Sequence, residues 1–249
     1  KNIYGTPVYT FDGHSGEGFA LAWSHSTPGT LLSGDMRGSI FLTKMNGSKF
    51  SVEREPFVGH TDSVEDLQWS PAAGEGTIFA SCSVDKSIRL WDSRSRKANN
   101  ALHLKNAHDA DVNVLSWNKL KTFLIASGGD EGAFKVWDLR MFGGQGKREP
   151  LIAMQYHQKP ITSIEWHPED ESVLICGCAD NQTTIWDMDM KKEDEELGQG
   201  QGAPSVPSQL LFVHQGQQDV KEVHWHPQIP GMLGSTALDN FHIFKTINS

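Results

Sequence analysis

FVGHTDSVEDLQWSP (57–71) and FASCSVDKSIRLWD (79–92) together form a unit that recurs along this chain. In this unit a His is followed nine positions later by a Trp, and two apolar runs follow, the second of which ends on Trp-Asp. Three further units keep the nine-residue spacing and a fifth has a spacing of 11; they begin at His14, His108, His157 and His214. Self-similarity at a nearly fixed period indicates a repeat architecture.

The length of the repeat points to one kind of unit. Successive histidines are 46, 48, 49 and 57 residues apart, near the roughly 40–45 residues of a four-stranded propeller blade. Alternating apolar residues such as Ile88 and Leu90 fit strands, and the polar pairs between runs fit tight turns. The other strand-turn-strand segments are LLSGDMRGSIFLT (31–43), LIASGGDEGAFKVWD (124–138), VLICGCADNQTTIWD (173–187) and MLGSTALDNFHIF (232–244). These segments resemble WD repeats.

The resemblance implies an all-β fold, a WD-repeat β-propeller with five visible repeats in a single domain over 1–249. The repeats are expected near 14–57, 60–105, 108–154, 157–190 and 214–247, with an acidic Gly/Pro loop at 191–208. We expect the C-terminal part of a seven-bladed ring, because an open five-blade arc exposes apolar faces. A closed five-bladed ring, with Pro7–Phe11 as the last outer strand, is the alternative.

One constellation within the repeat is expected to be structural. His60, Ser81, Asp85 and Trp91 have the spacing of the hydrogen-bonded relay found in WD repeats. The relay is expected to decay in the other units. Cys176 replaces its Ser in the fourth unit, Glu131 takes the Asp position in the third, and Arg37 and Thr43 stand in the Asp and Trp positions of the first.

Bulk composition limits the class of protein. The chain has 249 residues, of which 37% are hydrophobic, and its three cysteines lie in expected strands, which indicates a reducing compartment. It lacks a secretory segment or an apolar run of the roughly 18–20 residues that cross a bilayer. Because it starts without Met, we expect a fragment. The net charge of −9 favours basic partners and disfavours direct binding to nucleic acid.

The most unusual stretch is KKEDEELGQGQGAPSVPS (191–208). Its composition predicts a loop or local disorder, because such residues cannot bury enough apolar surface to order themselves. Glu193, Asp194, Glu195 and Glu196 offer carboxylates to basic side chains. Leu211 and Phe212 follow in the sequence and are expected to form an apolar surface beside that charge. A solvated loop without a partner is the alternative, and it is the commoner outcome for such insertions.

Longer segments carry a more specific resemblance: GHSGEGFALAWS (13–24), FVGHTDSVEDLQWSP (57–71), AHDADVNVLSW (107–117), ITSIEWHP (161–168) and QLLFVHQG (209–216). With these, the chain resembles the histone-binding WD-repeat group, which includes the retinoblastoma-binding histone chaperone, and within it the glutamate-rich WD-repeat proteins. In that group an acidic-proline loop and an N-terminal helix form a pocket for a histone helix. Here the loop matches in position and the helix is missing from the chain, so half of the pocket is expected.

The resemblance also implies a binding rim at the mouth of the central channel. Positions three and five after each His place Glu17, Phe19, Glu65, Asp111 and Asn113 there. Side chains alternate along a strand, so the residue five positions after each His should lie on the same side of the sheet as the apolar residue two positions further on. The rim would contact a basic tail in the histone-binding group, although Pro160 and Thr162 weaken the pattern in the fourth unit. A generic polar rim is the alternative reading.

Two repeats end in Trp-Asp-x-Arg and suggest a different partner. They place Asp92 with Arg94 and Asp138 with Arg140. The pattern resembles the box by which WD-repeat substrate receptors dock on the adaptor of a cullin ubiquitin ligase, and an exposed Arg suits carboxylate partners. A substrate receptor of such a ligase is therefore the alternative function.

Catalytic and metal motifs are weak. Residues 143–147 (GGQGK) fail as a phosphate loop because the first Gly and the final Ser/Thr are missing. His224 and His226 recur by repeat position, and we expect them to lack carboxylate or thiolate neighbours at metal spacing. We therefore expect no enzyme activity, no cofactor and no metal.

Taken together, the residues and the resemblance predict a non-enzymatic scaffold or chaperone for basic proteins. Its clients would be histones, a ribosomal protein or both, with roles in chromatin regulation and ribosome biogenesis. It would act in the nucleus and nucleolus without binding nucleic acid directly or contacting a membrane.

Overall fold

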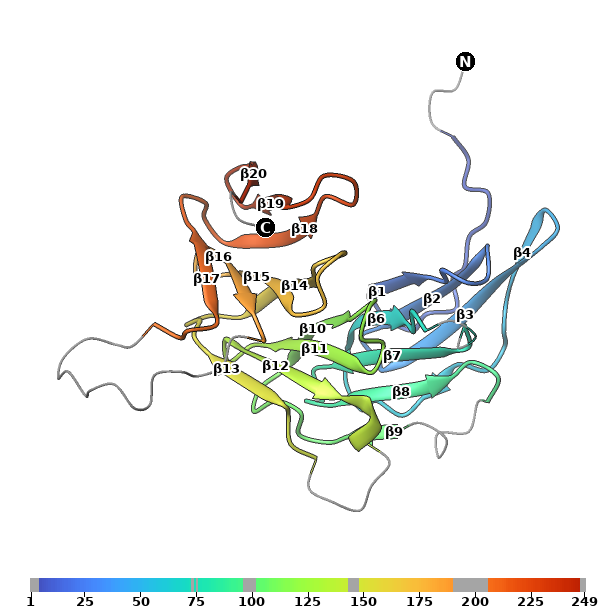
Figure 1. Cartoon of the computed structure of the whole chain (residues 1–249). Helices are drawn as coiled ribbons and strands as arrows, with labels where there is room; N and C mark the ends of the chain where they lie inside the picture. The colour runs from blue at the N-terminus through green and yellow to red at the C-terminus, as the bar shows by residue number, and fades with distance from the viewer. Residues whose placement is uncertain are drawn as a thin grey trace. The chain divides into compact units, whose positions relative to one another are not determined.

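The computed structural model describes residues 5–72, 74, 76–95, 102–142, 148–189 and 206–246. Within these residues the chain forms antiparallel β-sheets (Figure 1). The helical structure of the described part is one short 3₁₀ turn, Leu139–Met141, and none of it is a helix that could span a membrane. The predicted all-β fold is confirmed.

The first of two compact units comprises residues 1–107 and contains two sheets. The strands of the first sheet are β1 (Gly18–Trp23), β2 (Thr30–Asp35), β3 (Ser39–Asn46), β4 (Lys49–Val52) and β5 (Phe57–Val58). They run in the order β1-β2-β3-β4, and β5 also pairs with β3. The strands of the second sheet are β6 (Val64–Trp69), β7 (Ile78–Ser83), β8 (Ile88–Asp92) and β9 (Leu102–Leu104), in that order.

The second unit comprises residues 108–249 and contains three sheets, again with strands paired in chain order. Its first sheet holds β10 (Val112–Trp117), β11 (Leu124–Gly129), β12 (Ala133–Asp138) and β13 (Ile152–Gln155). The next holds β14 (Ile161–Trp166), β15 (Val173–Cys178), β16 (Gln182–Asp187) and β17 (Leu210–His214). The last holds β18 (Val220–Trp225), β19 (Met232–Ala237) and β20 (Phe241–Lys245).

Apolar side chains pack between successive sheets within each unit. In the first unit Leu32, Ile40 and Leu42 of one sheet pack with Phe79 and Trp91 of the next. In the second unit a similar cluster joins the sheets of β10–β13 and β14–β17. Since burying one large apolar side chain contributes about 1.5–3 kcal/mol, these layers provide the main stabilisation of each unit.

Tryptophan side chains tie neighbouring sheets together at one repeated position. The indole N–H of Trp69 donates to the carbonyl of Ala22 at 2.9 Å, and that of Trp166 donates to Ser116 at 3.0 Å. In both cases the acceptor is the residue before the Trp of the preceding sheet. Trp23 holds the same position in the first sheet, yet it is 57% exposed.

A β-bulge occurs near the start of every first strand. Pairing shifts register between Val64 and Asp66, so Glu65 has no partner in the ladder. The same shift occurs in the other four sheets and leaves out Phe19, Asn113, Thr162 and Lys221. A bulge inserts one extra residue and re-aims the side chain there. Alternation alone therefore does not determine the side of the sheet on which these residues lie.

The segment before the first sheet lies against that sheet. The rings of Tyr9 and Phe50 have centroids 6.0 Å apart, and those of Phe11 and Phe41 lie 5.0 Å apart. Residues 7–11 contain no strand. These contacts do not place Pro7–Phe11 as an outer strand of the last sheet.

Candidate functional site

Four buried or nearly buried side chains of the second sheet form one hydrogen-bonded chain. His60 donates from Nδ1 to Asp85 Oδ2 at 2.9 Å, and its Nε2 lies 2.6 Å from Ser81 Oγ. The same Ser81 oxygen accepts the indole N–H of Trp91 at 2.8 Å. The chain therefore ties the segment before β6 to both β7 and β8.

The protonation states fit a structural role for this relay. Burial lowers the pKa of His60, which keeps the ring neutral with one N–H to donate and one nitrogen to accept. Burial tends to raise the pKa of Asp85, but its hydrogen bonds with His60, Ser87 and the backbone of Thr61, with its other interactions, together outweigh burial and the pKa falls below its ordinary value. A neutral ring held between a carboxylate and a hydroxyl orients the loop and exposes no reactive group.

The third sheet repeats the relay with a longer acid. His108 Nδ1 lies 2.6 Å from Glu131 Oε1, and its Nε2 lies 2.7 Å from Ser127 Oγ. The indole N–H of Trp137 donates to the same Ser127 oxygen at 2.9 Å. Glu131 thus takes the place of the Asp, as its sequence position indicates.

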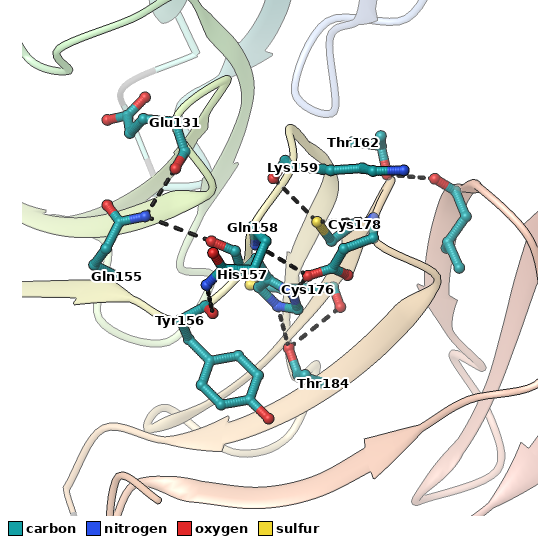
Figure 2. A network of polar contacts seen from close by, with 12 residues as sticks. Glu131, Gln155, Tyr156, His157, Gln158, Lys159, Thr162, Cys176, Cys178 and Thr184 are labelled. Atoms are coloured by element: carbon teal, nitrogen blue, oxygen red, sulfur yellow. Dashed lines mark hydrogen bonds and ion pairs between the residues drawn. The ribbon is translucent and has the colours of Figure 1, made fainter. Parts of the chain in front are cut away.

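In the fourth sheet the hydroxyl comes from a different strand. His157 Nε2 lies 2.9 Å from Thr184 Oγ1 (Figure 2). The same oxygen accepts the indole N–H of Trp186 at 2.7 Å. Thr184 on β16 is paired directly with Cys176 on β15. The expectation that Cys176 breaks the relay is therefore wrong, because the neighbouring strand supplies the missing hydroxyl.

The first sheet corrects a second expectation. His14 Nδ1 lies 2.9 Å from Asp35 Oδ2, and its Nε2 lies 2.8 Å from Ser33 Oγ. Asp35 precedes Arg37, and its other oxygen accepts the backbone N–H groups of Arg37 and Ser39. Asp35 therefore supplies the carboxylate that we expected Arg37 to have displaced.

The fifth sheet has a glutamine at the relay position. Ser235 donates its hydroxyl to Gln217 Oε1, and Gln217 Nε2 donates to Asn240 Oδ1 at 3.1 Å. His214 instead contacts His242, with Nε2 and Nδ1 2.8 Å apart. Counting from His214 therefore does not find Gln217, which takes the place of the relay histidine in this sheet. The spacing of 11 residues from His214 to Trp225, instead of nine, was the signal in the sequence.

Two groups bear on the expectation that metal sites are absent. His157, Cys178 and Asp180 offer ligand atoms within 4.8 Å of one another. Burial raises the pKa of the Cys178 thiol to about 12, and this thiol donates to the carbonyl of Lys159. A protonated thiol is a poor metal ligand. We therefore assign the group to the relay.

The second group corrects an expectation about His224. Its Nδ1 lies 3.2 Å from Glu165 Oε2, and its Nε2 lies 3.4 Å from Glu222 Oε2. The hydrogen bond that His224 donates to Glu165 raises the pKa of this ring. The expectation that carboxylates are absent around His224 is wrong, because Glu165 reaches it from the neighbouring strand β14.

The residues expected at the rim lie at the starts of the first strands. Glu17 and Phe19 are exposed, whereas Glu65, Asp111 and Asn113 are half-buried. Asn113 donates from Nδ2 to Asp130 at 2.8 Å and to the carbonyl of Ile161 in the next sheet at 3.2 Å. The Asn113 side chain therefore helps to join two sheets. Thr162 does the same by donating to the carbonyl of Val220.

The acidic loop lies largely outside the described residues. Glu193, Asp194, Glu195 and Glu196 fall in that part of the chain. Leu211 and Phe212 on β17 are exposed, and the Phe212 ring lies 6.0 Å from that of Phe244. An apolar surface therefore follows the loop.

A comparison with models of known protein families identifies the repeat directly. The family model described as WD domain, G-beta repeat matches residues 51–92, 100–138 and 148–187. The chain is built from WD40 repeats. Among curated proteins it is 45% identical over 246 residues to ribosome assembly protein rrb1 of Schizosaccharomyces pombe, which covers 97% of the chain and 50% of that protein.

Two further relatives are similar over the same extent. Protein HEAT STRESS TOLERANT DWD 1 of Arabidopsis thaliana is 48% identical over 97% of the chain and 52% of its own length. Glutamate-rich WD repeat-containing protein 1 of Dictyostelium discoideum is 47% identical over 98% of the chain and 50% of its own length. The WD-repeat chain therefore spans about half the length of the curated relatives that it matches.

The Trp-Asp-x-Arg ends of two WD repeats have the same local geometry. Arg94 donates from Nη2 to Asp92 Oδ2 at 2.6 Å and from Nε to Oδ1 at 2.9 Å. Arg140 pairs with Asp138 in the same way and also lies over the Phe123 ring, with Cζ 3.7 Å from the centroid. Both arginine side chains remain largely exposed, at 72% and 65%. Each guanidinium is therefore paired with the carboxylate two residues before it.

Proposed function

We propose that this WD-repeat chain is part of a non-enzymatic scaffold that binds basic proteins during ribosome assembly and on chromatin. Its clients would be a ribosomal protein, histones or both, and it would act in the nucleus and nucleolus. The observation that carries this proposal is the 45% identity, over 97% of the chain, with a protein named for ribosome assembly. A relationship to a histone acetyltransferase type B subunit 2, 26% identical over 96% of the chain, supports the histone client.

Charge provides the physical basis for the proposal. The net charge of −9 attracts basic chains over long range and speeds their association. Glu17, Glu65 and Asp111 lie where the first strands begin, and the Glu193–Glu196 run adds four carboxylates nearby in sequence to the exposed Leu211 and Phe212. We infer that these acids shield basic client segments from nucleic acid until delivery.

The test is recovery of clients from nuclear extract with the full-length protein at two salt concentrations. The loop variant carries Glu193→Gln, Asp194→Asn, Glu195→Gln and Glu196→Gln, which raises the net charge by four. The control variant carries Glu55→Lys and Glu169→Lys, two exposed positions elsewhere, and raises the net charge by the same amount. Selective loss of histones or a ribosomal protein with the loop variant supports the proposal. Equal recovery of the basic clients with both variants would show that the loop takes no part in binding them.

A second candidate function is substrate receptor of a cullin ubiquitin ligase. The exposure of Arg94 and Arg140 favours it, because each guanidinium bonds its own aspartate through Nε and Nη2 and keeps Nη1 to donate to a partner's carboxylate. If this function holds, changing both to Gln abolishes co-purification of the ligase adaptor. Undiminished adaptor in that double variant eliminates this candidate.

A further inference from the structure

The first sheet differs from the next three sheets at the position of the relay tryptophan. In those three sheets an indole N–H donates to the relay hydroxyl, from Trp91 at 2.8 Å, Trp137 at 2.9 Å and Trp186 at 2.7 Å. Thr43 holds this position in the first sheet, because it pairs with Leu31 on β2 as Trp91 pairs with Phe79 on β7. The relay of the first sheet therefore lacks its indole.

A hollow of about 530 Å³ lies beside Thr43. In the second sheet the rings of Phe57, His60 and Phe79 lie around Trp91, with centroids 5.8, 6.1 and 6.1 Å from that of its own ring. The residues at the equivalent positions of the first sheet all line the hollow: Phe11, His14 and Leu31. The hollow therefore has the surroundings of an aromatic side chain without the ring itself.

The relay hydroxyl of the first sheet is accessible and can accept a further hydrogen bond. Ser33 Oγ also lines the hollow, and its one partner among the described residues is His14 Nε2, at 2.8 Å. A hydroxyl oxygen has two lone pairs, so at least one of them stays open. Ser33 is half-buried and the His14 side chain is 19% exposed, whereas Ser81 and the His60 side chain are completely buried. A donor that enters the hollow can therefore reach Ser33.

An exposed apolar surface continues from the hollow along β1. Leu21 pairs with Ser33 and Trp23 pairs with Leu31, so both lie on the face that holds the hollow, and they are 67% and 57% exposed. Trp69 holds the position of Trp23 in the second sheet, where it packs with the first sheet and is 4% exposed. The indole N–H of Trp23 has no acceptor among the described residues. Within the first unit, this face therefore has the donor and the apolar side chains of a sheet interface but no covering sheet.

A further repeat of the same protein is the occupant that suits this face. The corresponding face of the second sheet is covered by the preceding repeat of the same chain. The chain spans 50–52% of the length of the curated relatives that it matches, and the rest of their length is enough for further WD repeats. A contiguous exposed apolar face marks a contact surface.

We propose that a Trp or Tyr side chain from a further WD repeat of the full-length protein fills the hollow at Thr43. Its N–H or O–H donates to Ser33 Oγ, in the place that Trp91 holds in the second sheet. An aromatic ring suits the apolar lining of the hollow, and a buried Trp or Tyr needs an acceptor for its polar hydrogen. Phe or Leu would fill the same space but would leave Ser33 without a donor.

The first test is photo-cross-linking in the full-length protein, with p-benzoyl-phenylalanine in place of Leu21 beside the hollow. The expected product joins this position to a peptide of the same protein outside the 249 residues, and that peptide contains Trp or Tyr. The same cross-linker in place of Val58, which is 55% exposed on β5, is the control and should not give this product. A cross-link to the last sheet would indicate a five-bladed ring and overturn the proposal. So would a cross-link to another protein, a peptide without Trp or Tyr, or no product.

The second test is Thr43→Trp in the full-length protein, with Thr43→Val as the matched control. If the hollow is already filled, the added indole overpacks it and should lower the urea midpoint by about 0.5 M relative to Thr43→Val. If the hollow is empty, the added indole completes the relay as Trp91 does in the second sheet. A midpoint equal to or higher than that of Thr43→Val therefore contradicts the proposal. The cross-link decides the matter if Thr43→Trp does not fold.

Discussion

At the scale of single residues, a hydroxyl group holds each relay together. In the fourth sheet Thr184 Oγ1 lies 2.9 Å from His157 Nε2 and 2.7 Å from Trp186 Nε1. We predict that Thr184→Val, which keeps the shape and removes the hydroxyl, lowers the free energy of unfolding by about 1–3 kcal/mol, because two buried nitrogens lose their partner. Urea denaturation of the full-length protein measures this change.

The matched variant for that test is Thr184→Ser. It keeps the hydroxyl and removes only a methyl group, so it should cost less than the valine substitution despite the smaller side chain. A valine variant as stable as the serine variant would contradict the role of Thr184. The distances in the fourth sheet would then describe proximity without a contribution to stability.

At the scale of elements, four hairpin turns share one backbone requirement. Gly38, Lys86, Gly132 and Asn181 all have positive φ, between 65° and 80°. A side chain at Gly132 would place its Cβ 2.4 Å from the carbonyl oxygen of His157, whereas one at Gly47, also at positive φ, would meet no atom within 4 Å. The turn at Gly132 therefore needs Gly chiefly for space, because Lys86 and Asn181 adopt a similar φ with side chains.

This difference gives the second prediction. Gly47→Ala should cost about 1 kcal/mol of unfolding free energy, from backbone strain alone. Gly132→Ala should cost a further 1–3 kcal/mol or so, because the chain must shift away from His157. Urea denaturation of both variants measures the difference. Equal costs would show that the turn moves freely and that its contact with the loop before β14 is unimportant.

The sequence predicts the strands well and the local irregularities poorly. His60 to Trp69 and Ser81 to Trp91 follow fixed spacings, so the order of strands and the relay of the second sheet could be derived by counting. The bulge at Glu65 could not be derived from alternation, although the buried positions Val64 and Leu67, three residues apart, carry its signal.

Partners supplied from another strand are the second kind of feature that counting misses. Thr184 replaces the hydroxyl missing at Cys176 because the two residues are directly paired across β15 and β16. Asp35 replaces the acid missing at Arg37 because its side chain reaches His14 from the end of β2. The first replacement depends on cross-strand register and the second on a shift of two positions along the chain, and only the folded sheets define either. The hollow at Thr43 likewise brings together residues from separate strands and from the segment before the first sheet.

At the scale of the whole molecule, four relays share the same chemistry. Each pairs a histidine with a carboxylate whose pKa is lowered below its ordinary value: Asp35, Asp85, Glu131 and Asp180. In each case burial tends to raise the pKa, and the hydrogen bond from the histidine, with other interactions, outweighs it. A carboxylate with a lowered pKa stabilises the fold at pH values above its unfolded pKa, and this contribution is lost as pH falls through the folded pKa.

The third prediction follows from this sign. All four carboxylates bind protons more readily in the unfolded chain, so stability should fall increasingly steeply below about pH 4.5, the highest of their ordinary pKa values. Asp85→Asn removes one of them, so its deficit in unfolding free energy relative to the wild type should be constant above pH 5 and shrink as the pH falls below about 3.8. Urea midpoints measured from pH 6 to pH 3 provide the comparison. A deficit that stays constant across this range would mean that Asp85 has the same pKa in the folded and unfolded chain, and the relay would then owe its stability to geometry and not to the charge of its acid.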